Sequence, residues 1–288
     1  MKKYILYIFT LVLAASCVKD SRLNFVEPDH IGFAGTEPVE QTTVCSGRYM
    51  TGIIKSGRNL SPAKVTLKVD PDTLTVYNAA HGTAYKALDP AKYSISNLSL
   101  DFLASDSRIT SEITWNPEEL ITAVTDDNFV IPIKVSCDDP SMLARNRNLL
   151  IVNIRPSSIG FVSNQVEYTE TKDRNAVSNL SVTAALTKAN PRDPVTVECA
   201  IDESLVRVFQ DETSYYYNLP PEGCITLVND SVTIAPGDKQ ATFKVLVNEE
   251  ALAPVHGGHV IPFKLTSVSM KGLPITQDIT YLIIKPNF

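Results

Sequence analysis

The run Val130-Ile-Pro-Ile-Lys-Val135 recurs as Val260-Ile-Pro-Phe-Lys-Leu265, an offset of 130 residues. In each run, apolar and polar side chains alternate with a period of two after the proline. This period is typical of a half-buried β-strand. Proline has no N–H to donate to a strand ladder, so we expect Pro132 and Pro262 at a sheet edge or a strand start.

Further matches keep the same order along the chain. Three pairs of segments correspond besides the proline run: Val65-Thr-Leu67 with Val195-Thr-Val197, Asp72-Thr-Leu74 with Glu203-Ser-Leu205, and Trp115-Asn116 with Val247-Asn248. Collinear matches at a nearly constant offset indicate an internal duplication. A length of 288 residues is suited to two domains. We therefore divide the chain into a signal peptide (1–16), a tether (17–23) and two copies of one domain (24–154 and 155–288).

Each copy consists mainly of short alternating runs that are separated by turn residues. Ala63–Val69 and Ala241–Val247 alternate, and Ala235-Pro-Gly-Asp238 is typical of a turn. Strands without intervening helix patterns predict an all-β fold of two tandem immunoglobulin-like β-sandwich domains. The Cys…Trp…Cys signature of antibody domains is absent, so only the architecture is predicted.

A family resemblance rests on the segments that precede the proline run. Tyr85-Lys-Ala-Leu88-Asp-Pro90-Ala-Lys-Tyr93 has a partner in Tyr216-Tyr217-Asn-Leu219-Pro-Pro221-Glu-Gly-Cys224. With the later Val-Ile-Pro-Phe-Lys run, this resembles the domain-of-unknown-function family at the N-termini of many Bacteroidetes surface lipoproteins. Some members precede a family 18 endoglycosidase domain and others a lectin-like module. The resemblance implies a role in glycan utilisation.

The N-terminus has the features of a bacterial secretory signal. Met1-Lys2-Lys3 is followed by an apolar run to Leu13 and then by Ala14-Ala15-Ser16-Cys17. The apolar run is shorter than the roughly 20 residues that span a bilayer. Leu13–Cys17 resembles a lipoprotein lipobox, which implies lipidation of Cys17 and attachment to outer-membrane lipid. The alternative is an ordinary cleaved signal in which Cys17 is incidental. Both the surface-exposed and the periplasm-facing orientation stay open.

Composition excludes some classes of function. Lys and Arg total 26 against 32 Asp and Glu, a formal charge of −6, whereas nucleic-acid binding requires clustered cations. Apolar residues make up 44% of the chain and charged residues 20%, which excludes a disordered tail.

Catalytic and metal-binding patterns are missing from the sequence. There is no Gly-x-Ser-x-Gly elbow, zinc motif or phosphate-binding glycine loop. We interpret His256-Gly-Gly-His259 as a solvated hairpin loop, and the pairs Glu118-Glu119 and Glu249-Glu250 as solvated turns between strands. The prediction is a protein without catalytic residues, metal or cofactor.

Four cysteines follow Cys17. Bridges Cys45–Cys137 and Cys199–Cys224 are possible, and four buried free thiols are the alternative. The second is favoured because the positions do not correspond between the copies, and Cys224 takes the place of Tyr93.

Exposed aromatic side chains would suit sugar binding, because their flat faces stack on sugar rings. The candidates are Trp115, Tyr215, Tyr216 and Tyr217. Trp115 corresponds to Val247 and could instead lie in the core. Tyr216 or Tyr217 corresponds to Tyr85 and could pack, and Tyr215 has no such explanation.

Two functions follow from these observations. The first is a non-catalytic outer-membrane lipoprotein that binds glycan, or serves as an accessory component, beside other outer-membrane glycan-import proteins. The alternative is a spacer or protein–protein interaction module of a cell-surface complex without a sugar site.

Overall fold

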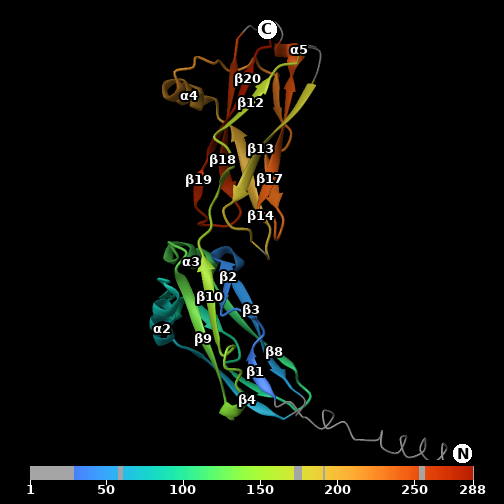
Figure 1. The fold of residues 1–288 in the computed structure, drawn as a ribbon. Coiled ribbons are helices and arrows are strands. Elements are labelled where there is room, and N and C mark those ends of the chain that lie inside the picture. The colour runs from blue at the N-terminus through green and yellow to red at the C-terminus, as the bar shows by residue number, and fades with distance from the viewer. Residues whose placement is uncertain (1–28, 58–60, 172–176, 191, 253–256, 288) are drawn as a thin grey trace, which may run out of the picture.

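The computed structural model describes residues 29–57, 61–171, 177–190, 192–252 and 257–287. Two β-sandwiches follow one another along the chain and stack end to end (Figure 1). The expected signal peptide, the tether and Cys17 lie outside the described residues. None of the described helices has the length and apolar character needed to cross a bilayer.

The first sandwich consists of two sheets. One sheet has the order β1 (His30–Phe33), β3 (Arg48–Ser56), β8 (Arg108–Trp115), β6 (Tyr93–Ile95). The other has the order β2 (Val39–Thr43), β10 (Leu149–Arg155), β9 (Phe129–Cys137), β4 (Ala63–Val69), β7 (Ser99–Phe102), and β5 (Lys86–Ala87) also pairs with β9.

The second sandwich repeats this strand order, with one further edge strand in its first sheet and an isolated bridge between Asn218 and His259 in place of β5. Its first sheet has the order β15 (Ile225–Leu227), β17 (Gln240–Asn248), β13 (Val177–Leu186), β11 (Ile159–Phe161), β19 (Ile275–Gln277). Its second sheet has the order β12 (Gln165–Thr169), β20 (Ile279–Lys285), β18 (His259–Val268), β14 (Val195–Ile201), β16 (Ser231–Ile234). The predicted all-β fold of two tandem sandwiches is confirmed.

Each copy begins with a strand that changes sheets. β1 and β11 run antiparallel to β3 and β13, and the chain then crosses so that β2 and β12 pair in parallel with β10 and β20. The crossing strands share the tripeptide Ile-Gly-Phe, which the sequence comparison missed. A Cβ atom on Gly32 would lie 2.7 Å from the Arg147 carbonyl oxygen, and one on Gly160 would lie 2.9 Å from the Gln277 nitrogen. Only glycine permits this close approach of a neighbouring backbone.

Pro132 and Pro262 lie inside β9 and β18, which are central strands of their sheets. The prediction that they lie at a sheet edge or a strand start is therefore wrong. Pairing of β4 with β9 ends at Val69, and the Pro132 oxygen accepts from the Asp70 nitrogen at 3.0 Å. In an antiparallel strand the N–H and C=O of a residue point to the same side. The proline nitrogen therefore faces a gap between the end of β4 and the start of β5, where no partner strand runs. Pro262 is placed in the same way, since its oxygen accepts from the Asp202 nitrogen at 3.1 Å.

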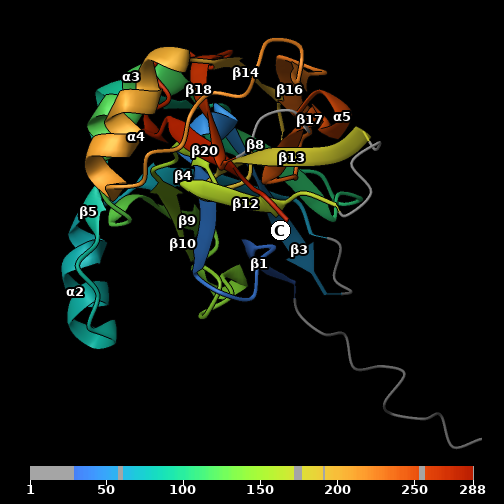
Figure 2. The same cartoon turned by 90° about the horizontal axis from the view of Figure 1, so that it is seen from above.

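Helices occur in both copies, although the sequence analysis expected no helices between the strands. The matched segments near Leu74 and Leu205 fold as α2 (Asp72–His81) and as η5 (Glu203–Leu205) followed by α4 (Val206–Thr213). α2 and α4 project from the same side of the molecule (Figures 1 and 2). Each copy also has a short helix that directly follows β8 or β17, α3 (Pro117–Ala123) or α5 (Glu249–Leu252). The remaining single turns are η2 (Val44–Ser46), η3 (Pro90–Lys92) and η4 (Pro140–Met142).

The four cysteines of the described chain are all free, which agrees with the favoured alternative. Cys45, Cys199 and Cys224 are buried, whereas Cys137 is only half-buried, contrary to the expectation. Cys224 does not replace Tyr93 either. Tyr93 pairs with Trp115 and Ile225 pairs with Val247, so Ile225 is the residue that corresponds to Tyr93.

We predict that Pro132→Ala destabilises the first copy by about 1–3 kcal/mol. The substitution creates a buried N–H that faces the gap without an acceptor. Urea denaturation followed by circular dichroism measures the change. The control is Pro71→Ala, at an exposed position before α2, which we expect to cost under about 1 kcal/mol through unfolded-chain entropy. A stabilised Pro132→Ala variant would contradict the gap.

Candidate functional site

α4 is held against the second sandwich by its apolar face. Phe209 is 1% exposed, and its ring centroid lies 4.8 Å from that of Tyr281 on β20. The helix ends at Thr213, and Ser214 adopts the left-handed conformation with φ of 60°. This residue turns the chain away from the helix axis and begins a run of three tyrosines.

The three tyrosines have different environments. Tyr217 is half-buried and lies between Phe209 (6.2 Å between ring centroids) and Tyr215 (5.7 Å), with both ring pairs nearly parallel. The Gln210 side chain donates to the Tyr217 carbonyl oxygen at 2.7 Å and fixes the loop. Tyr215 is 61% exposed and Tyr216 is 83% exposed. The loop therefore presents two aromatic rings to solvent, one of them supported by a stack.

Copy 1 has the same loop without the exposed rings. The Asn78 side chain donates to the Tyr85 carbonyl oxygen at 2.9 Å, as Gln210 does to Tyr217. In both copies the next residue donates its N–H to the residue that precedes the proline-bearing strand. Tyr85 and Tyr217 thus correspond and pack in both copies. At the positions of Tyr215 and Tyr216, copy 1 has Thr83 and Ala84.

The structure separates the aromatic candidates. It brings together Tyr215, Tyr216 and Tyr217, and it assigns the packing role to Tyr217 rather than to Tyr216. Trp115 is wrong as a surface candidate, because it is 7% exposed in the core of copy 1 and its Nε1 donates to the Val44 carbonyl oxygen at 2.8 Å. Val247, which corresponds to Trp115 in copy 2, is also buried.

An ion pair lies beside the tyrosine loop. The Lys285 ammonium is 2.6 Å from the Glu167 carboxylate. This hydrogen bond raises the pKa of Lys285, and the nearby Tyr217 and Tyr215 hydroxyls contribute less. Polar groups that donate and accept hydrogen bonds therefore border the exposed rings.

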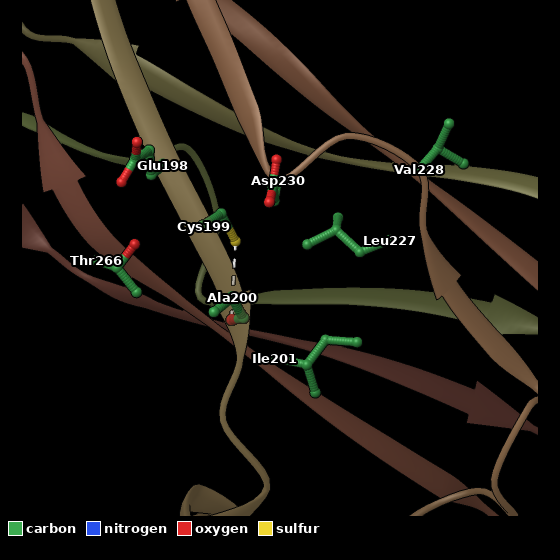
Figure 3. A pocket seen from close by; sticks show the side chains of 8 residues that line it. All are labelled: Glu198, Cys199, Ala200, Ile201, Leu227, Val228, Asp230 and Thr266. Carbon is green, nitrogen blue, oxygen red and sulfur yellow. Dashed lines mark hydrogen bonds between the residues drawn. The ribbon is translucent and has the colours of Figure 1, made fainter.

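A second feature is a hollow of about 590 Å³ along the free edge of β14 (Figure 3). Glu198 and Thr266 lie on one side of Cys199, and Leu227 and Ile201 lie on the other (Figure 3). Burial raises the pKa of Cys199 to about 12, so the thiol stays protonated near neutral pH. Glu198 accepts a hydrogen bond from Ser267 at 2.6 Å. The hollow thus offers no activated nucleophile.

The sequence analysis expected the paired carboxylates in solvated turns; Glu118, Glu119 and Glu250 are exposed as expected, but the pairs begin helices and Glu249 is buried. They form the first turns of α3 and α5, and Glu249 is 1% exposed. Its carboxylate accepts hydrogen bonds from Tyr168, from Ser178 and from the backbone and hydroxyl of Thr171. Burial raises the pKa of Glu249, but these hydrogen bonds outweigh it and the net pKa is lowered. An ionised, fully hydrogen-bonded carboxylate fixes local structure and is unsuited to donate a proton.

His259 is likewise not part of a solvated loop. It is 1% exposed at the start of β18, where copy 1 has Phe129, and neither ring nitrogen has a hydrogen-bond partner. His256 lies outside the described residues. Across the described ranges, His, Cys, Asp and Glu side chains form no group of three or more that could hold a metal ion.

Comparison with known proteins gives one family and several distant structures. A family model described as an N-terminal domain matches residues 33–142 and, a second time, residues 153–272. No curated protein sequence matches significantly.

Three solved structures illustrate the distant likeness. The CBD12 structure of CALX1.2 has 9% identity and a TM-score of 0.39, over 88% of this chain and 99% of that one. A putative carbohydrate binding protein from Bacteroides ovatus has 14% identity and a TM-score of 0.38, over 86% of this chain and 61% of that one. EndoBT-3987 from Bacteroides thetaiotaomicron has 14% identity and a TM-score of 0.32, over 44% and 30%. At these TM-scores the likenesses carry no conclusion about ligand or activity.

We predict that Ser214→Gly stabilises the second copy by about 0.5–1 kcal/mol. The left-handed conformation costs an L-residue about 1–2 kcal/mol, which glycine avoids. The greater conformational entropy of the unfolded glycine variant offsets part of this gain in stability. In copy 1 the corresponding helix end is Gly82, with φ of 64°. The reciprocal Gly82→Ser should therefore lower the urea midpoint. Shifts of the same sign in both variants would contradict the correspondence.

Proposed function

This chain belongs to the family of N-terminal domains whose model it matches twice, which is the family that its sequence resembles. We propose that it is a non-catalytic glycan-binding lipoprotein of the bacterial outer membrane. The observation that carries the proposal is the exposure of Tyr215 and Tyr216 on a loop where copy 1 has Thr83 and Ala84. A residue pair that the fold does not need in one copy is free to serve a ligand in the other.

Binding would rest on stacking. The faces of Tyr215 and Tyr216 match the apolar faces of sugar rings, while Lys285 and Glu167 offer a donor and an acceptor to hydroxyl groups. The stack of Tyr215 on Tyr217 and the left-handed Ser214 hold the loop in one conformation, which lowers the entropy cost of binding. The surface is open, so we expect weak binding that gains strength on a polymer with repeated units.

The test replaces the two tyrosines by the residues of copy 1. Tyr215→Thr combined with Tyr216→Ala should weaken retention in affinity electrophoresis against a panel of plant and host polysaccharides. Two stacked rings at about 0.5–1.5 kcal/mol each correspond to about fivefold to 150-fold in affinity.

The matched control is Thr83→Ala in copy 1, which should retain full binding. Thermal unfolding checks that both variants fold. Equal retention of the double variant and the original protein would remove the tyrosine loop from the proposal.

The lipid anchor is part of the same proposal. Lipidation of Cys17 would place the two sandwiches at the outer membrane, close to proteins of a glycan-import system. Mass spectrometry of protein from a native membrane fraction should give an acylated N-terminal Cys17, and Cys17→Ala should move the protein to the soluble fraction. An unmodified N-terminus beyond Cys17 would contradict the anchor.

A protein-interaction module is the second candidate, and the edge of β14 favours it. β16 covers β14 only from Val195 to Glu198, and Cys199 donates its N–H to the Asp230 carbonyl oxygen. By the alternation of an antiparallel strand, Ile201 directs its N–H and C=O into the hollow of Figure 3. A free edge of this kind accepts an added strand from a partner. Co-purification of a partner that Ile201→Pro abolishes, without binding to any glycan, would favour this candidate.

A further inference from the structure

A notch lies at the junction of the two copies, away from the tyrosine loop. Its volume is about 280 Å³, and it is bordered by Gln41, Thr43, Arg155, Lys188 and Lys239. Gln41 and Thr43 lie on β2 of copy 1, Arg155 ends β10 of the same sandwich, and the two lysines belong to copy 2. The junction around it is packed, because buried Asn190 of copy 2 donates to the Cys45 carbonyl oxygen of copy 1 at 3.4 Å. The notch is therefore built from both copies.

Positive charge in the notch exceeds negative charge. Arg155 and Lys188 both approach the same oxygen of Asp127, Lys188 at 3.9 Å. Within the described part of the chain, Lys239 forms no ion pair. Arg155 and Lys188 thus share one carboxylate and Lys239 adds a third cation, in a chain whose formal charge is −6. This local excess runs against the net charge of the protein.

Hydrogen-bond donors accompany the charge. The Thr43 hydroxyl oxygen accepts from the Cys45 nitrogen at 3.3 Å and caps η2 beside the notch. The Arg155 guanidinium is held in place by the Gln41 side chain at 3.0 Å and by Asp127, while its buried Nε has no hydrogen-bond partner. Donors held by neighbouring groups beside uncompensated cations favour an anion.

We propose that the notch between the two copies binds a carboxylate or sulfate group. The anion would lie between Lys188 and Lys239 of copy 2 and beside the Arg155 guanidinium of copy 1, so that its binding also links one copy to the other. Ligand sites occur preferentially at domain interfaces. The chemistry is shared by a free inorganic anion and by a uronic acid or sulfated sugar.

The experiment titrates the full chain by isothermal titration calorimetry at fixed ionic strength. The probes are sodium sulfate, sodium glucuronate and, as the neutral counterpart, glucose. We expect binding of sulfate, glucuronate or both, and none of glucose. Each of Lys188→Met and Lys239→Met should weaken binding about fivefold, the value of one unit charge at about 4 Å in water. Raising the salt concentration should weaken binding further.

The control is Lys244→Met, an exposed lysine of β17 outside the notch, which should bind like the original protein. Binding of sulfate alone supports a free inorganic anion as the ligand, and binding of glucuronate alone supports an acidic sugar. Absence of binding, equal binding of glucose, or indifference to both lysine substitutions overturns the proposal. Tyr215→Thr combined with Tyr216→Ala should leave anion binding unchanged. The proposal for the notch is therefore tested independently of the proposal for the tyrosine loop.

Discussion

The absence of an N–H on one residue of a central strand organises both copies. At Pro132 and Pro262 the strand cannot donate toward β4 or β14, and those neighbours end one residue before the proline is reached. After β4 or β14, the chain leaves the sheet, and it returns to pair with the start of the proline-bearing strand, β9 or β18. α2 and α4 make this crossing. The tyrosine loop is the return path, so its position follows from the proline.

The duplication provides an internal comparison for every residue of that loop. Tyr85 and Tyr217 have the same backbone hydrogen bonds and pack in the same way, which identifies them as structural. Thr83 and Ala84 show that the loop folds without exposed aromatic rings. Tyr215 and Tyr216 expose apolar surface that no packing in the second copy requires, and exposed aromatic surface on a fixed loop is typical of a binding site.

Buried polar groups in this protein have a structural role, whereas the charged groups at the junction of the two copies can still bind a ligand. Glu249 has its charge satisfied by donors from three residues, so it fixes the end of the second sandwich. Cys199 stays a thiol because burial disfavours the thiolate. The cations at the junction are different, because they outnumber their one carboxylate partner. The chemistry available at each site therefore depends on which partners surround a charged or titratable side chain, and the net charge and sequence motifs do not reveal those partners.

The sequence by itself determined the duplication and the β-class of both copies, because alternation and collinear matches are local properties of the chain. Only the tertiary structure decided that Pro132 lies in a central strand, that Glu249 and His259 are buried, and that Trp115 faces the core. Each of these depends on where a neighbouring strand ends or which sheet covers a residue. The junction notch is of the same kind, since Thr43 and Lys239 are 196 positions apart in sequence and meet only when the copies stack.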